Sequence, residues 1–201
     1  MKKLVFGKGI NDSKVPVTFW GEDGKRKTCP YYERWTDMLR RCYCEKQLAR
    51  MPAYKNAQVC DEWLVFSNFK NWMESQSWEG KVLDKDFLSD SKVYSPSTCV
   101  FIPEYVNFAL MGSTSYRGVT YHKRDKVYQA SIRKFGKGFY LGSFSTEEAA
   151  KEAYRKAKKV YLEEVIDMYT EGVYDVRIVD RLKEEIKRND QDFSEVCKSN
   201  R

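Results

Sequence analysis

Residues 116–157 read YRGVTYHKRDKVYQASIRKFGKGFYLGSFSTEEAAKEAYRKA, and this stretch dictates more of the architecture than any other part of the chain. Apolar and polar residues alternate over 116–121, 127–133 and 139–144, which predicts three short strands. Turn-forming runs separate them, first residues 122–126 and then residues 136–138. Ser145 or Thr146 can cap a following helix, and Glu147 and Glu148 suit its N-terminal end. The stretch therefore predicts a three-stranded antiparallel sheet followed by a helix.

That helix is expected over residues 146–170, ending before Gly172. A stripe of mostly small side chains allows it to lie close to the sheet, namely Ala149, Ala150, Ala153, Tyr154 and Ala157. Residues 176–188 predict a further amphipathic helix, and the last dozen residues are expected to fray.

Positive charge is concentrated in this middle block. Residues 113–160 hold 12 Lys or Arg against 4 Asp or Glu, a net of +8, whereas residues 1–112 carry +3 and residues 161–201 carry −4. The whole chain carries +7. A small basic sheet is a candidate to lie in a groove of nucleic acid.

The N-terminal part has a different pattern. Residues 15–24 suggest a hairpin arm, Pro30 precedes a helical pattern that reaches Tyr43, residues 45–58 resemble a loop, and residues 59–73 predict a second helix. Aromatic residues recur along that second pattern, and such spacing is typical of a core: Trp63, Phe66, Phe69 and Trp72.

A short strand is predicted over residues 81–88 and a turn over 89–92. Loop and strand then follow over 93–101, and a helix over 103–111 that contains Asn107 and ends at Gly112. This order makes a compact ββα-like unit. The fold class expected for the chain is therefore α+β.

Six cysteines are present, with no Cys-x-x-Cys pair and a single histidine. A structural zinc site built from Cys42, Cys44, Cys60 and Cys99 is conceivable, but its spacing matches no standard finger. Burial as small hydrophobes in a reducing compartment is favoured instead for Cys42, Cys60 and Cys99. The sequence contains no run of 18 apolar residues that would predict a membrane-spanning helix. The N-terminal residues resemble the start of a signal peptide, but Lys8 interrupts their apolar segment. We expect a soluble, cytoplasmic protein.

Four short motifs resemble the Apetala/ethylene-responsive-factor DNA-binding domain, which is known from plant transcription factors and from phage and bacterial homing endonucleases. They are Tyr116-Arg117-Gly118-Val119, Tyr128-x-Ala130-x-Ile132-Arg133, Tyr140-Leu141-Gly142-x-Phe144-x-Thr146-x-Glu148-Ala149-Ala150 and Ala153-Tyr154-x-x-Ala157. The resemblance covers about 45 residues and implies a three-stranded sheet in the major groove of double-stranded DNA, backed by one long helix.

Position by position, Arg117 and Arg133 match groove contacts of that family, and Tyr140 stands where the family often has Trp. Thr120 and His122 stand where plant members have arginines, so the base preference of those members does not transfer. Physically, the two arginines suit guanine edges. Further cations suit phosphates: Lys123, Arg124, Lys126, Lys134 and Lys137.

Residues 1–112 resemble phage HNH-type (His-Me finger) homing endonucleases. The motifs are Trp35-x-x-Met38-x-x-Arg41-Cys42-Tyr43, the aromatic series from Cys60 to Trp72, Leu83-Asp84-Lys85-Asp86, Tyr94-Ser95-Pro96-x-Thr98-Cys99-x-Phe101 and Asn107. Many such proteins end in the same DNA-binding domain. The implied division is a nuclease domain over 1–112, a targeting domain over 113–160 and a helical extension over 161–201.

An HNH site implies one divalent metal, Mg²⁺ or Mn²⁺ with oxygen ligands, and a histidine base. Here Asp84 and Asn107 match the ligand positions, with Asp86 in support. Lys85 stands where the family has its histidine, and His122 belongs to the other domain. Three interpretations stay open: Lys85 acts as the base, the carboxylates hold a metal whose bound water attacks, or the finger is inactive and only helps to bind DNA.

The function expected from both resemblances is a site-directed, homing-type DNA endonuclease of a bacteriophage, acting in the host cytoplasm. The main alternative is a non-catalytic DNA-binding regulator or host-takeover protein on a degenerate nuclease scaffold. An RNA-directed role is less favoured, because the sheet lacks a clear aromatic platform for splayed bases.

Overall fold

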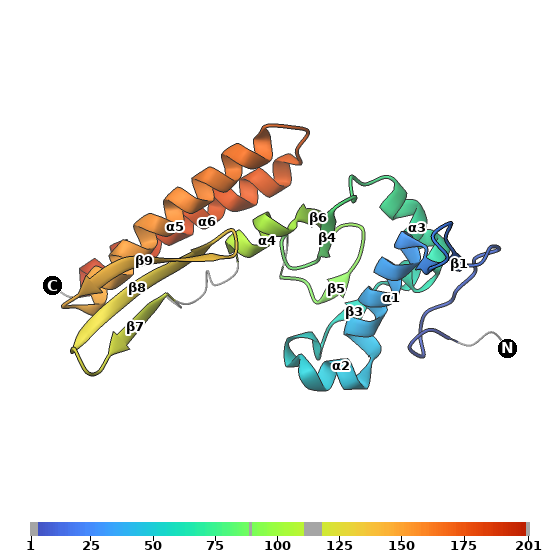
Figure 1. Ribbon diagram of the computed structural model, residues 1–201, viewed down its shortest axis with the longest axis horizontal. Coiled ribbons are helices and arrows are strands. Elements are labelled where there is room, and N and C mark those ends of the chain that lie inside the picture. Colours follow the sequence, from blue (N-terminus) through green and yellow to red (C-terminus); the bar gives the residue numbers. More distant parts are fainter. Residues whose placement is uncertain (1–3, 89, 111–117, 200–201) are drawn as a thin grey trace. The chain divides into compact units, whose positions relative to one another are not determined.

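A computed structural model of the chain describes residues 4–88, 90–110 and 118–199, with side chains as far as residue 190. The chain forms two compact units, Met1–Ile102 and Pro103–Arg201. Small sheets and helices occur in both (Figure 1), so the predicted α+β class is confirmed.

The first unit begins with the predicted hairpin arm. Strand β1 (Thr18–Trp20) pairs antiparallel with β2 (Arg26–Thr28). Helix α1 (Pro30–Tyr43) follows, with proline at its first position, where the missing N–H costs no hydrogen bond. Its buried face is the one that the sequence pattern predicts: Trp35, Met38, Leu39 and Cys42.

Two predictions in the next segment are wrong. The expected loop contains helix α2 (Glu45–Arg50) and the 3-10 turn η1 (Pro52–Tyr54), and α2 buries no residue, so it has no apolar periodicity to detect. The expected helix over 59–73 begins only at α3 (Phe66–Glu74). Before it come strand β3 (Gln58–Val59) and the 3-10 turn η2 (Asp61–Leu64).

Three further strands complete the first unit: β4 (Lys81–Asp84), β5 (Val93–Tyr94) and β6 (Val100–Pro103). Strand β5 pairs in parallel with β3, and β4 pairs with β6. Strand β4 is shorter than predicted because Asp84 Oδ1 accepts hydrogen bonds from the N–H groups of Asp86 and Phe87, each 2.8 Å long, which turns the chain.

An aromatic core holds this unit together. Trp35, Trp63 and Phe69 are fully buried, and the Trp35 indole N–H donates to the carbonyl of Trp63 over 2.7 Å. Trp63 also packs against Trp72 with ring centroids 4.4 Å apart. The prediction that the spaced aromatics form core is therefore confirmed.

The second unit opens with helix α4 (Glu104–Leu110). Its sheet consists of β7 (Val119–His122), β8 (Val127–Lys134) and β9 (Lys137–Phe144), paired antiparallel in that order. Helix α5 (Glu147–Thr170) follows, and the Thr146 hydroxyl caps it by accepting from the Ala149 N–H. The three predicted strands and the long helix are thus present.

Helix α5 packs on β8 and β9, and helix α6 (Val176–Ser199) packs on α5. Ala130 and Ile132 on β8 are buried, as is Ala150 on α5. Helix α6 extends beyond residue 188, so the expected fraying of the last dozen residues is wrong for the backbone as far as Ser199. Ile178, Val179 and Leu182 of the predicted amphipathic pattern are buried, whereas Val176 at the start of the helix is exposed.

Candidate nucleic-acid interface

The sheet of the second unit has one covered face and one open face. Ala130 and Ile132 are buried on the side of α5, and successive side chains of a strand point to opposite faces. Gln129, Ser131 and Arg133 therefore share the open face, and both Ser131 and Arg133 are exposed. No hydrogen bond or ion pair engages the Arg133 guanidinium among the residues that the structure describes.

Strand pairing extends this face across the sheet. Gln129 lies opposite Thr120 on β7 and Ser143 on β9, and Ser131 lies opposite Tyr140. The sequence analysis missed Gln129, Ser131 and Ser143. The available signal was their alternation with the apolar residues of the same strands.

A β-bulge turns Tyr140 outward. Ala130 pairs with Gly142, but the next residue, Ser131, pairs with Tyr140, so Leu141 is the extra residue of β9. In an unbroken register Leu141 would lie opposite Ser131 and take the open face. Gly142 adopts φ +135°, which favours glycine at this point of the bulge. Tyr140 is 64% exposed, and its hydroxyl lies 2.6 Å from Ser143 Oγ.

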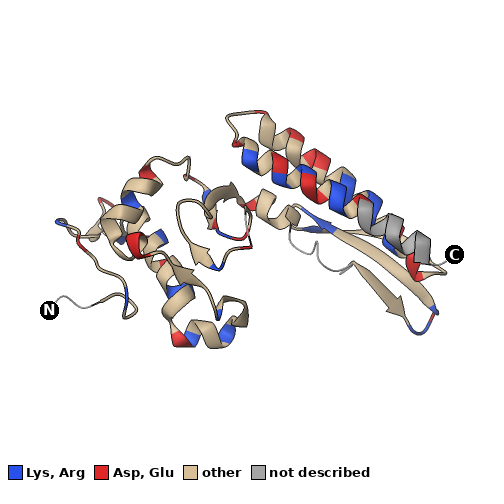
Figure 2. Cartoon of the chain, turned by 180° about the vertical axis from the view of Figure 1, so that it is seen from behind, with Lys and Arg blue, Asp and Glu red and all other residues tan. Residues whose placement is uncertain are grey.

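Cations lie at both ends of the sheet. The turn between β7 and β8 carries Lys123, Arg124 and Lys126, all exposed, and the other end carries Arg133, Lys134 and Lys137. Figure 2 shows both ends of the sheet in blue with an uncharged stretch between them. Asp125 is the one acid in residues 118–144, and its carboxylate lies 2.9 Å from Arg124 Nε and 3.2 Å from His122 Nδ1.

Lys134 differs from the other predicted phosphate contacts. Its ammonium nitrogen lies 3.0 Å from Glu164 Oε2 on α5 and 5.6 Å from the centre of the Tyr161 ring. Its side chain therefore leans toward the helix rather than the open face. Lys134 therefore contacts Glu164 and Tyr161 of α5. Its contact with a DNA phosphate stays a prediction.

Tyr116 and Arg117 lie outside the described residues, so the predicted groove contact of Arg117 has no geometry here. The first described residue of this stretch is Gly118, whose carbonyl accepts a hydrogen bond of 2.7 Å from the Ser131 N–H.

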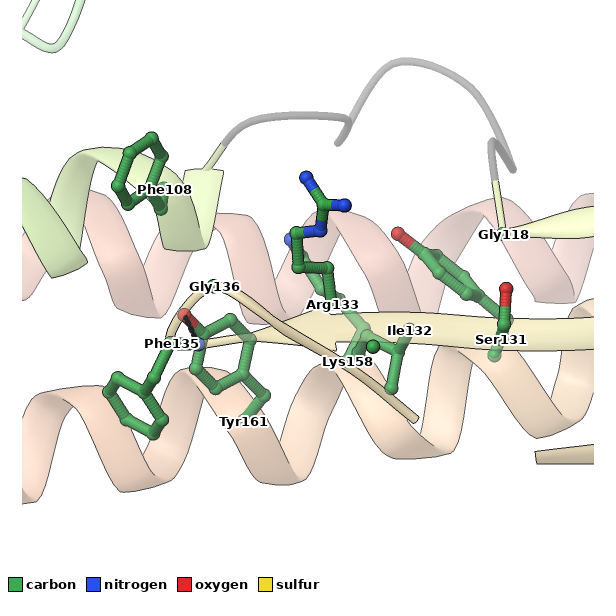
Figure 3. A pocket seen from close by; sticks show the side chains of 11 residues that line it. Phe108, Gly118, Ser131, Ile132, Arg133, Phe135, Gly136, Lys158 and Tyr161 are labelled. Atoms are coloured by element: carbon green, nitrogen blue, oxygen red, sulfur yellow. Dashed lines mark hydrogen bonds between the residues drawn. The ribbon is translucent and has the colours of Figure 1, made fainter. Parts of the chain in front are cut away.

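A cavity of about 570 Å³ lies beside the end of β8 (Figure 3), and its walls include Phe108, Arg133, Tyr154 and Lys158. Lys158 is buried, and its ammonium group donates a 2.5 Å hydrogen bond to the Ala109 carbonyl at the end of α4. Burial lowers the pKa of Lys158. This bond attaches α4 to α5 inside the second unit.

The predicted catalytic residues of the first unit are engaged in internal contacts. Burial raises the pKa of Asp84, whose Oδ1 already accepts the two backbone hydrogen bonds that end β4. Lys85 is 4% exposed, contacts the Asp86 carboxylate and lies 5.7 Å from the centre of the Tyr94 ring. The carboxylate of Asp86 thus neutralises a buried ammonium group.

The metal prediction has little support from these contacts. In the part of the chain that the structure describes, no group of three His, Cys, Asp or Glu side chains is placed to hold an ion. Asn107 lies on α4 in the second unit, whereas Asp84 lies in the first unit. Neither unit by itself therefore contains both predicted metal ligands. A metal site at Asp84 and Asp86 stays a prediction.

The cysteines of the proposed zinc set differ in burial. Cys42 and Cys99 are buried, as predicted, and burial raises the pKa of each thiol to about 12. Cys60 is only half-buried, which corrects that prediction, and Cys44 is half-buried as well.

Comparison of the chain with family models, curated proteins and solved structures finds no match. Among the described residues, no helix has both the length and the apolar character needed to cross a membrane.

Proposed function

We propose that this chain is a double-stranded DNA-binding protein that inserts the open face of the β7–β8–β9 sheet into the major groove. One observation carries the proposal: an exposed sheet face combines Arg133, which no other described residue engages, with hydrogen-bonding side chains, and cations lie at both of its ends. The resemblance of residues 116–157 to the Apetala/ethylene-responsive-factor domain supports the same assignment.

The groove has the dimensions and chemistry that such a face suits. B-DNA's major groove is about 12 Å wide, which admits strands of a sheet, and each base pair there presents a distinct pattern of donors and acceptors. Arg133 suits the two acceptors of guanine, while Gln129 suits adenine. Lys123, Lys126 and Lys137 lie toward the strand ends, where phosphates would flank the groove.

Substitution of Arg133 tests this proposal. Duplexes selected from a randomised pool with the wild-type protein supply the preferred site, and fluorescence anisotropy measures affinity for it and for an unrelated duplex. We expect Arg133→Ala to weaken binding to the selected site by about 5- to 150-fold, the value of one good base contact. Binding to the unrelated duplex should fall much less.

Lys156→Ala is the matched control, because it removes one positive charge from α5, where Lys156 is 71% exposed and pairs with Glu152. It should change neither affinity by more than about two-fold. Equal effects of the two substitutions on both duplexes would remove the open face as the reading surface.

A second candidate function is metal-dependent cleavage of DNA by an HNH-like finger. The observation that favours it is the order of elements, since β4 pairs with β6 and α4 follows directly. Asp84 and Asp86 would then supply carboxylate ligands to Mg²⁺ or Mn²⁺, with Lys85 as base or phosphate contact, while Asn107 stays a predicted ligand. The alternative is a DNA-binding regulator that has lost this activity.

Plasmid cleavage separates these alternatives. Nicking that requires Mg²⁺ or Mn²⁺, stops with EDTA and is lost in Asp84→Asn would support the nuclease, because the amide keeps the acceptor oxygen that ends β4 but loses the charge. Intact plasmid under every condition, with DNA binding retained, would support the regulator.

A further inference from the structure

The β1–β2 hairpin of the first unit carries an aromatic and basic surface that the proposed groove contact does not use. Trp20 is 75% exposed and Phe19 is 48% exposed, although both lie in a regular strand. A ring as exposed as that of Trp20 adds little packing to a hairpin of three residue pairs. Exposed aromatic surface of this kind is typical of a binding site.

The hairpin has a defined shape. The Gly21 N–H donates a hydrogen bond of 2.8 Å to the Lys25 carbonyl. The Asp23 carboxylate accepts a hydrogen bond of 3.2 Å from the Lys25 N–H. At the base of the hairpin the Cys29 N–H donates 2.8 Å to the carbonyl of Val17, which packs against the core. The aromatic side chains therefore project from an anchored turn rather than from a loose terminus.

Charge identifies the kind of partner. Residues 25–27 are Lys-Arg-Lys and the turn before them holds Glu22 and Asp23, so residues 18–28 carry a net charge of +1. Lys27 pairs with Asp23 at 3.4 Å, but Arg26 makes no ion pair within the described part of the chain. Arg26 is the cross-strand partner of Trp20, so both side chains lie on one face of the hairpin. Both also help to line a hollow of about 310 Å³.

The exposed Trp20 indole lies beside the Arg26 guanidinium, which forms no ion pair within the described part of the chain. These two groups suit the base and the phosphate of a single nucleic-acid strand. An aromatic ring offers a stacking surface to any base, and a cation beside it can pair with the phosphate of the same nucleotide. A base inside a perfect duplex is stacked on both sides and offers no face to Trp20. The chemistry therefore favours an unpaired or unstacked base.

We propose that the β1–β2 hairpin is a second DNA contact, in which Trp20 stacks on an unpaired base and Arg26 binds the adjoining phosphate. The inference deepens the proposed function and rests on it: the substrate becomes DNA that contains a locally opened segment. The open sheet face would supply the duplex contact and the hairpin the single-strand contact.

The test uses the full chain and three fluorescein-labelled DNAs of equal length: a perfect duplex, the same duplex with a two-nucleotide unpaired bulge, and the single strand. We expect Trp20→Ala to weaken binding to the bulged duplex and the single strand by about 5- to 150-fold, as expected for loss of one stacked base. Binding to the perfect duplex should change by less than about two-fold.

Two control variants isolate the stacking contact. Trp20→Phe keeps an aromatic ring and should recover most of the lost affinity. Phe19→Ala removes an exposed ring from the neighbouring position, whose cross-strand partner is Lys27, and should have the smaller effect. Thermal unfolding should match wild type in all three variants, because neither ring is buried in the core.

The possible results separate this inference from the proposed function. With the selected site in the perfect duplex, Arg133→Ala should weaken binding to that duplex and spare the single strand. If Trp20→Ala binds all three DNAs as wild type does, the hairpin contact is wrong while duplex binding stands. If the single strand binds in a Trp20-dependent way and the duplex does not bind, the hairpin contact stands and the groove proposal is wrong. No binding to any DNA by the wild type would overturn both, and a protein partner for the hairpin would replace them.

Discussion

Asp84 combines a structural contact with a predicted chemical role, and the two can be separated. Its Oδ1 accepts the hydrogen bonds that end β4, and its burial raises its pKa above the ordinary value of 3.8. The folded state therefore binds this proton more tightly than the unfolded state. The contribution of Asp84 to stability is greatest below pH 3.8 and is lost as the pH rises through the raised folded pKa.

We therefore expect Asp84→Asn to be at least as stable as wild type at pH 7, with an advantage of about 1 kcal/mol or less that shrinks toward pH 4. Urea denaturation of both proteins at pH 4, 5, 6 and 7 measures this difference. Asp86→Asn is the contrasting variant, since it leaves the buried Lys85 without its carboxylate and should lose about 1–3 kcal/mol at pH 7. A larger loss for Asp84→Asn at pH 7 than at pH 4 would contradict the burial argument.

At the level of elements, the approach of β7 to β8 and α5 depends on Gly118. A Cβ at this position would lie 2.0 Å from the Ser131 carbonyl oxygen and 2.4 Å from the Tyr154 ring. Ser131 is paired with Tyr140 of β9, so its backbone oxygen has less freedom to move than the end of a side chain. The sequence resemblance includes this glycine, but only the packed sheet and helix give the reason.

Gly118→Ala should therefore destabilise the protein by about 1–3 kcal/mol through overpacking. Gly138→Ala is the matched control on β9, because a Cβ there meets no atom within 4 Å and the backbone φ is not positive. Thermal unfolding of the two variants provides the measurement. Equal stability of the two variants would show that β7 has room to move.

For the whole molecule, the distribution of charge is the property that bears on binding. Residues 118–144 hold six Lys or Arg and one Asp, whereas residues 161–201 carry a net of −4. Several cations on α5 are paired with acids of α5 and α6, as in the contacts of Arg155 with Glu152 and Asp190 at 2.7 and 2.6 Å. The sheet is thus the part of this unit whose positive charge is least compensated.

We expect the logarithm of DNA affinity to fall linearly with the logarithm of salt concentration, with a slope of about −4 if four or five phosphates are neutralised. Replacing Lys123 and Lys126 together by Ala should make the slope shallower by about 2, because these cations lie on the exposed turn between β7 and β8. Anisotropy titrations from 50 to 300 mM salt measure both slopes. An unchanged slope would place the phosphate contacts elsewhere on the chain.

The sequence by itself determined the elements whose pattern is local and repeated: helix α1 with its buried Trp35 and Leu39, the three strands of the basic sheet and the capped helix α5. Non-local pairing determined the rest. The sequence pattern placed Val59 at the start of a helix, but tertiary structure pairs it with Tyr94 in a strand. Asp84 ends β4 because its side chain accepts hydrogen bonds from the N–H groups of Asp86 and Phe87. The place of Arg133 on the open face could be predicted from the sequence. The outward turn of Tyr140 depends on a bulge, and the contact of Lys134 with Glu164 depends on the packing of α5. Neither could be predicted, because both are set by contacts between residues distant in the chain.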